Sequence, residues 1–192
     1  ALVGRYAELL KRDVPPSSIL CCTFARKAAD ELKERIKSST GIATSKLPIG
    51  TFHSLANRAV KELAPLLGIE PPTDVLRENV RRKIITEIRD ANEDICKALK
   101  FDQKRPSTIL TSIDDFRERL LSPDNALVEA SEFADVILIA HSEIYALYDQ
   151  HLTKHKLIDY ARMIQFAVRA FELDAAGDKS FVSRYGHILV DE

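Results

Sequence analysis

Three short apolar runs, each ending in a polar turn, most limit the folds open to this sequence. They cover Ile19–Thr23, Ile49–Thr51 and Ile188–Val190, and the first two lead directly into helical patterns. A short apolar run between polar residues is typical of a strand buried in a parallel sheet. The alternation of strand, turn and helix therefore predicts an α/β fold with a doubly wound parallel sheet.

The third run ends in two adjacent acids, Asp191 and Glu192. Ligands of open α/β sheets bind at the carboxyl ends of the strands. In nucleotide hydrolases this position suits an Asp that holds Mg²⁺ and a Glu that orients or deprotonates the attacking water. The hypothesis is that Asp191 helps to hold Mg²⁺ and that Glu192 is the catalytic base. The alternative is that both acids cap a following helix.

The pattern between the second and third runs changes to successive amphipathic helices. Proline-containing turns separate these helices, and β-branched strand runs disappear. Asp74 and Ser107 are candidate caps for two of the helices. We therefore expect a core made of residues 1–54 and 158–192, interrupted by an all-helical lobe over residues 55–157.

Three motifs resemble superfamily 1 DNA helicases of the UvrD/Rep/PcrA type. Motif Ia of that family is similar to TFARKAADELKERI, which starts at Thr23. Motif Ib is similar to IGTFHSL, which starts at Ile49, and the start of motif II, the Walker B element, is similar to HILVDE, which starts at His187. The resemblance covers nearly all of the chain, in the family's order. It implies a RecA-like parallel-sheet P-loop NTPase core, subdomain 1A, with an inserted all-helical subdomain, 1B.

The resemblance implies the N-terminal portion of an ATP-dependent DNA helicase that moves 3′ to 5′ along single-stranded DNA. Its cofactors would be ATP and Mg²⁺, and its partners single-stranded DNA and single-strand/double-strand junctions. The family's phosphate-binding loop, G-x-x-x-x-G-K-[ST], does not occur in the sequence, and nothing else replaces its glycines and lysine. We therefore expect a chain cut within the active site, which does not hydrolyse ATP alone.

The first turn predicted to contact DNA contains Thr23, Phe24, Arg26 and Lys27. It leads into a helix N-terminus, which presents free N–H groups to a phosphodiester. An aromatic ring beside it can stack on a base without reading sequence. The family usually has Thr-Asn where this sequence has Ala25-Arg26, so a hydroxyl and an amide are replaced and a cation is added. A core position for Phe24 is the alternative.

The second predicted DNA-contact turn runs from Gly50 to Ser54. Gly50 allows a tight turn or a close backbone approach, and Thr51, His53 and Ser54 offer short donors to phosphate oxygens. The alternative role of Thr51 or Ser54 is to cap the following helix. Phe52 is expected in the core.

A third candidate contact lies at Asp159-Tyr160, which resembles an Asp-aromatic pair of the family at the start of a helix beside the DNA path. Tyr160 is a candidate stacking ring and Arg162 a candidate phosphate partner. The alternative is that Asp159 caps the helix and that Tyr160 is a half-buried packing residue.

Two further clusters lie in the helical region. His151 and His155 have the spacing of a metal pair, but no third ligand is evident nearby. A local basic cluster is usually a solvated face, although the family's helical lobe can touch duplex DNA. The cluster consists of Lys97, Lys100, Lys104 and Arg105.

Composition limits the classes of function. The net charge is −1, whereas a dedicated duplex-DNA binder is usually more basic; a cleft that holds a single strand needs only a few cations, amides and rings. No apolar stretch reaches the roughly 20 residues that span a bilayer, and no signal-peptide pattern is present. Three cysteines do not make a disulfide framework and are expected in the core. We predict no membrane partner and a cytoplasmic location, associated with the nucleoid in a bacterium or archaeon.

Two other interpretations stay open. A RecB- or AddA-like helicase–nuclease subunit shares these motifs, and Arg26-Lys27 is common there. A non-catalytic DNA- or partner-binding module could keep the fold without the motor. The sequence identifies no protein partner.

Overall fold

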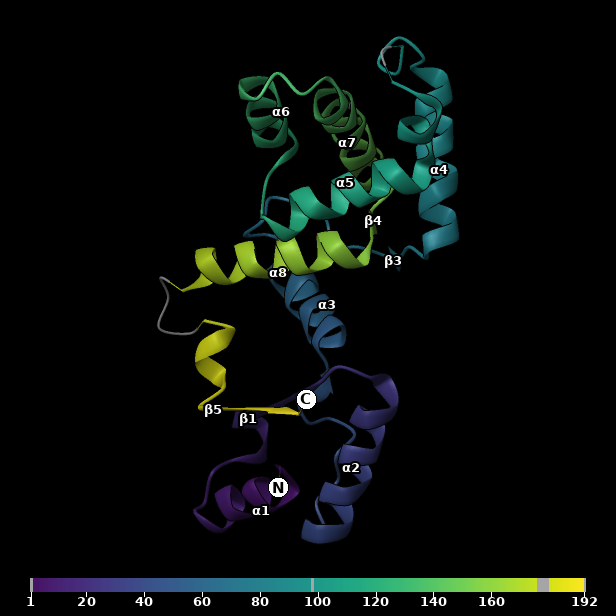
Figure 1. Ribbon diagram of the computed structural model, residues 1–192. Helices are drawn as coiled ribbons and strands as arrows, with labels where there is room; N and C mark the ends of the chain where they lie inside the picture. The colour runs from purple at the N-terminus through teal and green to yellow at the C-terminus, as the bar shows by residue number, and fades with distance from the viewer. Residues whose placement is uncertain (1, 98, 176–179, 192) are drawn as a thin grey trace. The chain divides into compact units, whose positions relative to one another are not determined.

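The chain forms two compact units, described one at a time below. Unit 1 contains Ala1–Gly68 and Ala167–Glu192, and unit 2 contains Ile69–Phe166. The computed structural model (Figure 1) describes residues 2–97, 99–175 and 180–191.

A three-stranded parallel sheet forms the centre of unit 1. Its strands are β1 (Ile19–Thr23), β2 (Ile49–Thr51) and β5 (His187–Asp191), in the order β2-β1-β5. β1 pairs with both neighbours in parallel. The three apolar runs of the sequence are therefore the three strands, and the predicted mixture of helices and parallel strands is confirmed.

Strand β5 is less buried than its apolar sequence predicts. Ile188 is 57% exposed and Val190 is 52% exposed, while Leu189 packs into the core. Successive side chains of a strand point to opposite faces, and β5 is an edge strand that pairs only with β1 among the described residues. The expectation of a strand buried on both faces is therefore wrong for β5, because one of its faces is left open.

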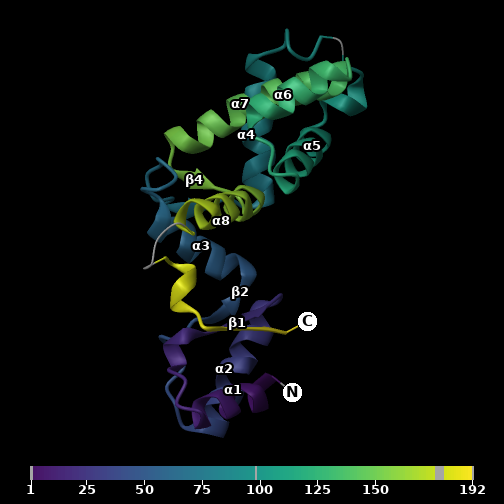
Figure 2. The same cartoon turned by 90° about the vertical axis from the view of Figure 1, so that its left-hand side faces the viewer.

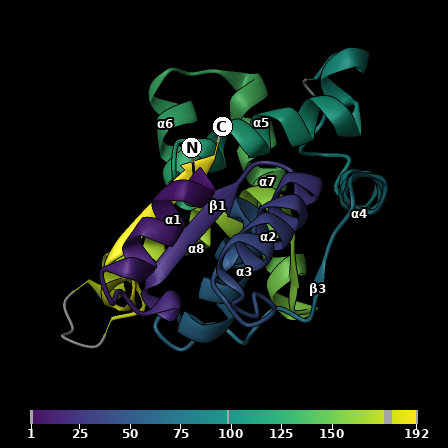
Figure 3. The same cartoon turned by 90° about the horizontal axis from the view of Figure 1, so that it is seen from below.

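Helices lie on both faces of this sheet, although Ile188 and Val190 of β5 stay exposed. Helices α1 (Leu2–Lys11) and α2 (Arg26–Thr40) lie side by side on one face, and α3 (Phe52–Leu63) lies on the other (Figures 1, 2 and 3). Both α1 and α2 turn apolar residues toward the strands, at the spacing expected for amphipathic helices. The resulting core contains Tyr6, Leu9, Ile19, Cys21, Leu32, Ile36 and Ile49.

The boundaries between the two units lie after Gly68 and after Phe166. The domain boundaries predicted from the sequence lie after residues 54 and 157. Helix α3 accounts for the first difference, because its buried face packs within unit 1. Helix α8 (Tyr160–Asp174) accounts for the second difference, because its second half packs in a hydrophobic cluster of unit 1 to which α3 also contributes. This cluster joins Ala59, Leu63, Ala170 and Phe181.

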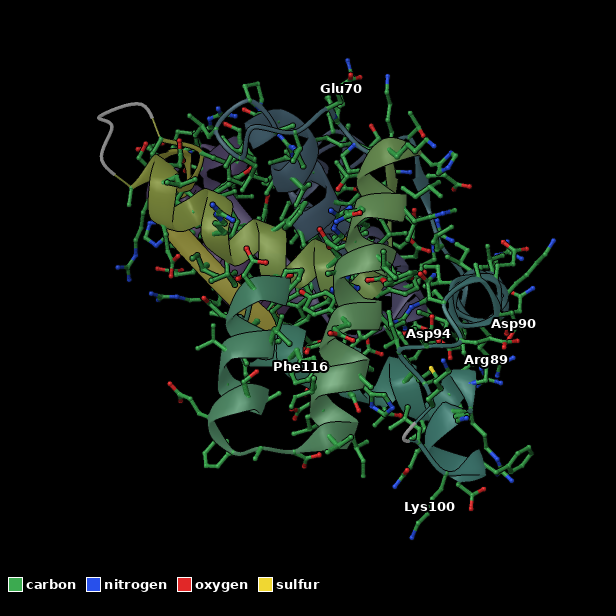
Figure 4. All side chains as sticks on the ribbon, turned by 90° about the horizontal axis from the view of Figure 1, so that it is seen from above. Glu70, Arg89, Asp90, Asp94, Lys100 and Phe116 are labelled. Carbon is green, nitrogen blue, oxygen red and sulfur yellow. The ribbon has the colours of Figure 1, made fainter. Side chains whose placement is uncertain are left out.

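In its described residues, unit 2 is built mainly from four α-helices and the first turns of α8. The helices are α4 (Glu78–Ala91), α5 (Pro106–Glu118), α6 (Pro123–Glu132) and α7 (Val136–Lys154). α6 and α7 lie side by side (Figure 2), and Phe116 of α5 lies among the helices (Figure 4), where it is 1% exposed. This unit has a large apolar core of its own.

Unit 2 is not all-helical, contrary to the prediction. β3 (Asp74–Val75) and β4 (Leu157–Ile158) form a short parallel pair. The backbone N–H of Leu76 donates to the carbonyl of Ile158 at 2.7 Å. The two segments are far apart in the chain, so no local pattern reveals the pairing.

Both predicted caps in this unit are wrong. Asp74 lies in β3, where its carboxylate accepts from the N–H of Val75 at 2.8 Å. Ser107 is the second residue of α5, which begins at Pro106. Proline suits this first helical position because its φ is already helical and the N–H it lacks would have no intrahelical partner.

The three cysteines are buried and free, as expected for small core residues. Burial raises the pKa of Cys21 to about 12, and the neighbouring Cys22 adds to this rise. The Cys21 thiol is therefore protonated and unreactive near neutral pH. None of the helices that the structure describes is both long enough and apolar enough to cross a membrane.

Candidate functional site

The carboxyl ends of the three strands of unit 1 lie at one edge of the sheet. Backbone pairing aligns Thr23 of β1 with Thr51 of β2 on one side and with Asp191 of β5 on the other. Both β1 and β2 lead into helices at this level. The predicted contact turns and the predicted metal ligand therefore start from one row of residues, which we call the carboxyl row: Thr51, Thr23 and Asp191.

The turn after β1 places its first side chains in opposite environments. Thr23 is 1% exposed, and its hydroxyl donates to the carbonyl of Ala25 at 2.9 Å. Phe24 is 82% exposed. The Thr23 side chain therefore shapes the turn and is not accessible to a ligand, contrary to the prediction. The alternative that Phe24 is a core ring is also wrong, because its ring faces solvent.

Helix α2 begins without a side-chain cap. Its N-cap residue is Ala25, whose side chain cannot accept a hydrogen bond from the first turn. Arg26 and Lys27 are exposed, and Lys27 makes only a loose pair with Glu31, with Nζ and Oε1 3.8 Å apart. The first N–H groups of α2 and two exposed cations thus lie together beside Phe24, where an anion would be stabilised.

The turn after β2 is closed by a reciprocal pair of hydrogen bonds. The Thr51 hydroxyl oxygen accepts from the N–H of Ser54 at 3.2 Å, and the Ser54 hydroxyl donates to the Thr51 carbonyl at 2.8 Å. The capping alternative for Thr51 is confirmed. Because a hydroxyl that accepts one bond keeps its own O–H, Thr51 can cap the helix and still donate to a ligand.

Gly50 packs closely against the same turn. A Cβ at this position would displace the Ser54 hydroxyl and so disturb its bond to the Thr51 carbonyl. Phe52 is 43% exposed, so the expectation that it lies in the core is wrong. His53 is half-buried in the first turn of α3. The exposed rings of Phe24 and Phe52 each directly follow a member of the carboxyl row.

Asp191 is exposed at the end of β5, whereas Glu192 lies outside the described residues. No group of three or more His, Cys, Asp or Glu side chains within the described ranges could hold a metal ion by itself. Mg²⁺ is commonly held by one or two carboxylates together with phosphate oxygens and waters. The single described carboxylate of Asp191 fits such a shared site and does not fit an all-protein metal cage.

The third predicted contact lies in unit 2, at the start of α8. Asp159 is fully buried, and its Oδ1 accepts from the backbone N–H of Arg162 at 2.8 Å. This confirms the alternative that Asp159 caps the helix. Tyr160 is 52% exposed, so its ring is accessible to a ligand.

Arg162 cannot act as the predicted phosphate partner in this conformation. It is 3% exposed, and its guanidinium donates to Asp149 at 2.9 Å, to the Thr153 hydroxyl at 2.6 Å and to the Leu157 carbonyl at 3.3 Å. The prediction is therefore wrong. Burial also lowers the pKa of Arg162, although Asp149 opposes this effect.

A buried ionic network around Asp159 was missed by the sequence analysis. Oδ2 of Asp159 lies 2.6 Å from Nη1 of Arg117 and 3.3 Å from Nε of Arg81, and it accepts from the Tyr148 hydroxyl at 2.8 Å. Burial opposes ionisation of Asp159, but Arg117 and Arg81 outweigh it and lower the pKa of the carboxyl. The only sequence signal was an arginine within the apolar pattern of each of two helices.

His151 and His155 have ring centroids 4.5 Å apart. No third His, Cys, Asp or Glu of the described chain joins them in a group that could hold a metal ion. The spacing of the two histidines alone therefore does not indicate a metal site.

Parallel strands whose carboxyl ends present exposed rings, donors and a carboxylate define an α/β protein with a candidate ligand-binding edge. The family model of the UvrD/REP helicase N-terminal domain matches residues 1–192, and the chain belongs to this family. The resemblance found in the motifs is thereby confirmed.

Curated relatives are similar at a low level of identity. The chain is 27% identical over 194 residues to the ATP-dependent DNA helicase PcrA of Staphylococcus epidermidis, and 26% identical to that of Staphylococcus aureus. Each alignment covers 100% of this chain and 25% of the relative. The chain therefore spans about a quarter of the length of the curated relatives it matches.

Proposed function

We propose that this chain is part of an ATP-dependent DNA helicase that moves 3′ to 5′ along single-stranded DNA. In this proposal unit 1 belongs to a RecA-like core and unit 2 to an inserted subdomain. Family membership supports the helicase class. The observation that carries the rest is the carboxyl row, since it aligns both candidate DNA turns with the candidate metal ligand.

The two turns beside the carboxyl row would bind a single strand without reading its sequence. Phe24, with an exposed ring, would stack on a base. The uncapped N–H groups of α2, together with Arg26 and Lys27, would bind a phosphate. Thr51 would donate its O–H to a neighbouring phosphate, with His53 and Ser54 in the same turn. Tyr160 of unit 2 is a further proposed stacking ring.

The nucleotide side of the proposal rests on Asp191. Its carboxylate would contribute one ligand to Mg²⁺, which would neutralise charge on the phosphates of ATP. Glu192 is proposed as the base for the attacking water. The sequence contains no G-x-x-x-x-G-K-[ST] loop, so ATP binding would also require residues outside this sequence. The proposed DNA substrate is a junction between single-stranded and double-stranded DNA. The proposed cellular location is the cytoplasm.

The proposal is tested by fluorescence anisotropy of a labelled oligo-dT strand titrated with the chain. Phe24→Ala should weaken binding at least about fivefold, because stacking of a base on an aromatic ring is worth ~1–3 kcal/mol. Raising the salt concentration should weaken binding further, since phosphate contacts release counterions.

Phe133→Ala is the matched control, because Phe133 is another exposed ring, at 75%, on unit 2. This variant should bind like the parent chain. Equal binding by Phe24→Ala and the parent would refute the proposed DNA edge, and so would the absence of binding at low salt.

A further inference from the structure

The exposed side of α3 carries two cations in line with the turn after β2. Ser54, Arg58 and Lys61 are all exposed, and their spacing of i, i+4 and i+7 places them on one face of the helix. We call Arg58 and Lys61 the basic face of α3. The opposite side of the helix is buried and consists of Ala56, Ala59, Val60 and Leu63.

The basic face begins beside the carboxyl row. Helix α3 starts directly after β2 (Figures 1 and 2), and Thr51 of the carboxyl row caps it. A helix rises about 1.5 Å per residue, so Arg58 lies about 6 Å and Lys61 about 10 Å along the axis from Ser54. The basic face therefore continues, along α3, the set of donors to phosphate proposed at the turn.

No carboxylate of the described chain neutralises this face. Neither Arg58 nor Lys61 forms an ion pair within the described ranges, and the acid of α3, Glu62, is paired with Arg184. Residues three positions apart are neighbours on a helix surface, and neighbouring like charges are destabilising. An anion bound beside Arg58 and Lys61 would relieve this repulsion.

Other charged surfaces of the chain carry acids among their cations. On α2, Nζ of Lys27 lies 3.8 Å from Oε1 of Glu31. In the basic cluster of unit 2, Lys97 is paired with Asp94. Surfaces of mixed sign are typical of solvated helix faces. The basic face of α3 differs from them because its two cations have no acid of their own.

We propose that Arg58 and Lys61 bind phosphates of the single strand whose bases stack at the carboxyl row. This inference rests on the proposed function, in which Thr51 binds one phosphate; the basic face would bind its neighbours along the strand. Arg58 can donate two parallel N–H bonds to one phosphate, whereas Lys61 acts as a point charge. A single strand fits because the exposed ring of Phe24 can stack only on an unpaired base.

The salt dependence of oligo-dT binding, measured by fluorescence anisotropy, tests this proposal. Each phosphate contact with a single strand contributes about 0.7 to the slope of log K against log salt concentration. The double variant Arg58→Gln/Lys61→Gln should therefore reduce the slope by about 1.4. Some binding should remain, because Phe24 and the α2 N-terminus are unchanged. Thermal unfolding should match that of the parent, since glutamine suits a helix and both positions are exposed.

The matched control is Arg35→Gln/Lys37→Gln, which removes the same two charges from exposed positions of α2. Arg35 lies about 13 Å along the axis from the start of that helix, which exceeds the screening length of about 8 Å at physiological ionic strength. The slope of the control should therefore match that of the parent chain.

Two results would overturn the role of the basic face and leave the DNA edge standing. One is an unchanged slope in Arg58→Gln/Lys61→Gln while Phe24→Ala still weakens binding. The other is an equal loss of slope in both double variants, since the effect would then come from net charge. Absence of binding by the parent chain at low salt would refute the DNA edge and the basic face together.

Discussion

Single residues in unit 2 carry charges that the helical core would normally exclude. Arg117 and Asp159 are both fully buried, 42 residues apart in the sequence. The two charges stabilise each other, Asp149 also pairs with Arg117, and Arg81 and the Tyr148 hydroxyl also contact Asp159. Removing one member leaves an uncompensated buried charge, which is far more costly than losing an exposed pair.

Asp159→Ala should lower the free energy of unfolding by about 3 kcal/mol or more, because it leaves Arg117 buried without its nearest counter-charge. Urea denaturation measures this value. Asp115→Ala is the control: its pair with Arg119 is exposed, with Nη1 and Oδ2 3.4 Å apart, and its loss should cost less than about 1 kcal/mol. Similar losses in the two variants would contradict a structural role for the network.

The same residue sets an acid dependence of stability. The pKa of Asp159 is lowered from its ordinary 3.8, so its ionised form stabilises the folded chain above pH 3.8. This contribution is lost as the pH falls below 3.8 and through the folded-state pKa. The stability difference between the parent and Asp159→Ala should therefore shrink on acidification in that window, and a constant difference would be inconsistent with it.

The two strand–turn–helix elements of unit 1 begin their helices in different ways. In the β2–α3 element, Thr51 caps α3 and also belongs to the carboxyl row. In the β1–α2 element, Ala25 provides no side-chain cap, so the α2 N-terminus stays open. The two elements have the same order along the chain but different helix starts, which suits one to a rigid turn and the other to anion binding.

Thr51→Ala should destabilise the chain by about 1 kcal/mol, because α3 loses its N-cap acceptor. Thr51→Ser keeps the hydroxyl and should recover most of this loss. Denaturant unfolding followed by circular dichroism compares the three chains. If Thr51→Ser were as unstable as Thr51→Ala, the methyl packing and not the cap would account for the effect.

The molecule as a whole joins a parallel-sheet unit with a mainly helical unit, each with its own core. The candidate DNA turns and Asp191 lie in unit 1, and the buried network of Arg117 and Asp159 lies in unit 2. The two regions can therefore be tested separately, because substitutions in one unit leave the residues of the other in place.

The chain alone should release no phosphate from ATP, with or without oligo-dT. Its sequence contains no phosphate-binding loop, and the chemistry of phosphoryl transfer depends on such a loop to position the nucleotide. A phosphate-release assay at saturating ATP and Mg²⁺ checks this. DNA-stimulated turnover that disappears in Asp191→Ala would contradict the expectation.

Local patterns were enough to predict the three strands of unit 1, the helices that follow β1 and β2, and the turns of the carboxyl row. Alternating apolar and polar residues report on neighbours a few positions away, and these elements depend mainly on such neighbours. The family motifs lie in the same segments, so the candidate DNA turns and the end of β5 were also found from the sequence by itself.

Tertiary structure alone decided which polar side chains face inward. The sequence suggested that Arg162 is an exposed partner for phosphate, but hydrogen bonds to Asp149 and Thr153 of α7 hold its side chain inside unit 2. Phe24 could have been a core ring, but the turn directs it to solvent. The sequence by itself determined the order of strands, turns and helices, because local spacing sets them. Only the tertiary structure decided burial, because a buried charge is stable only where distant segments bring its partners.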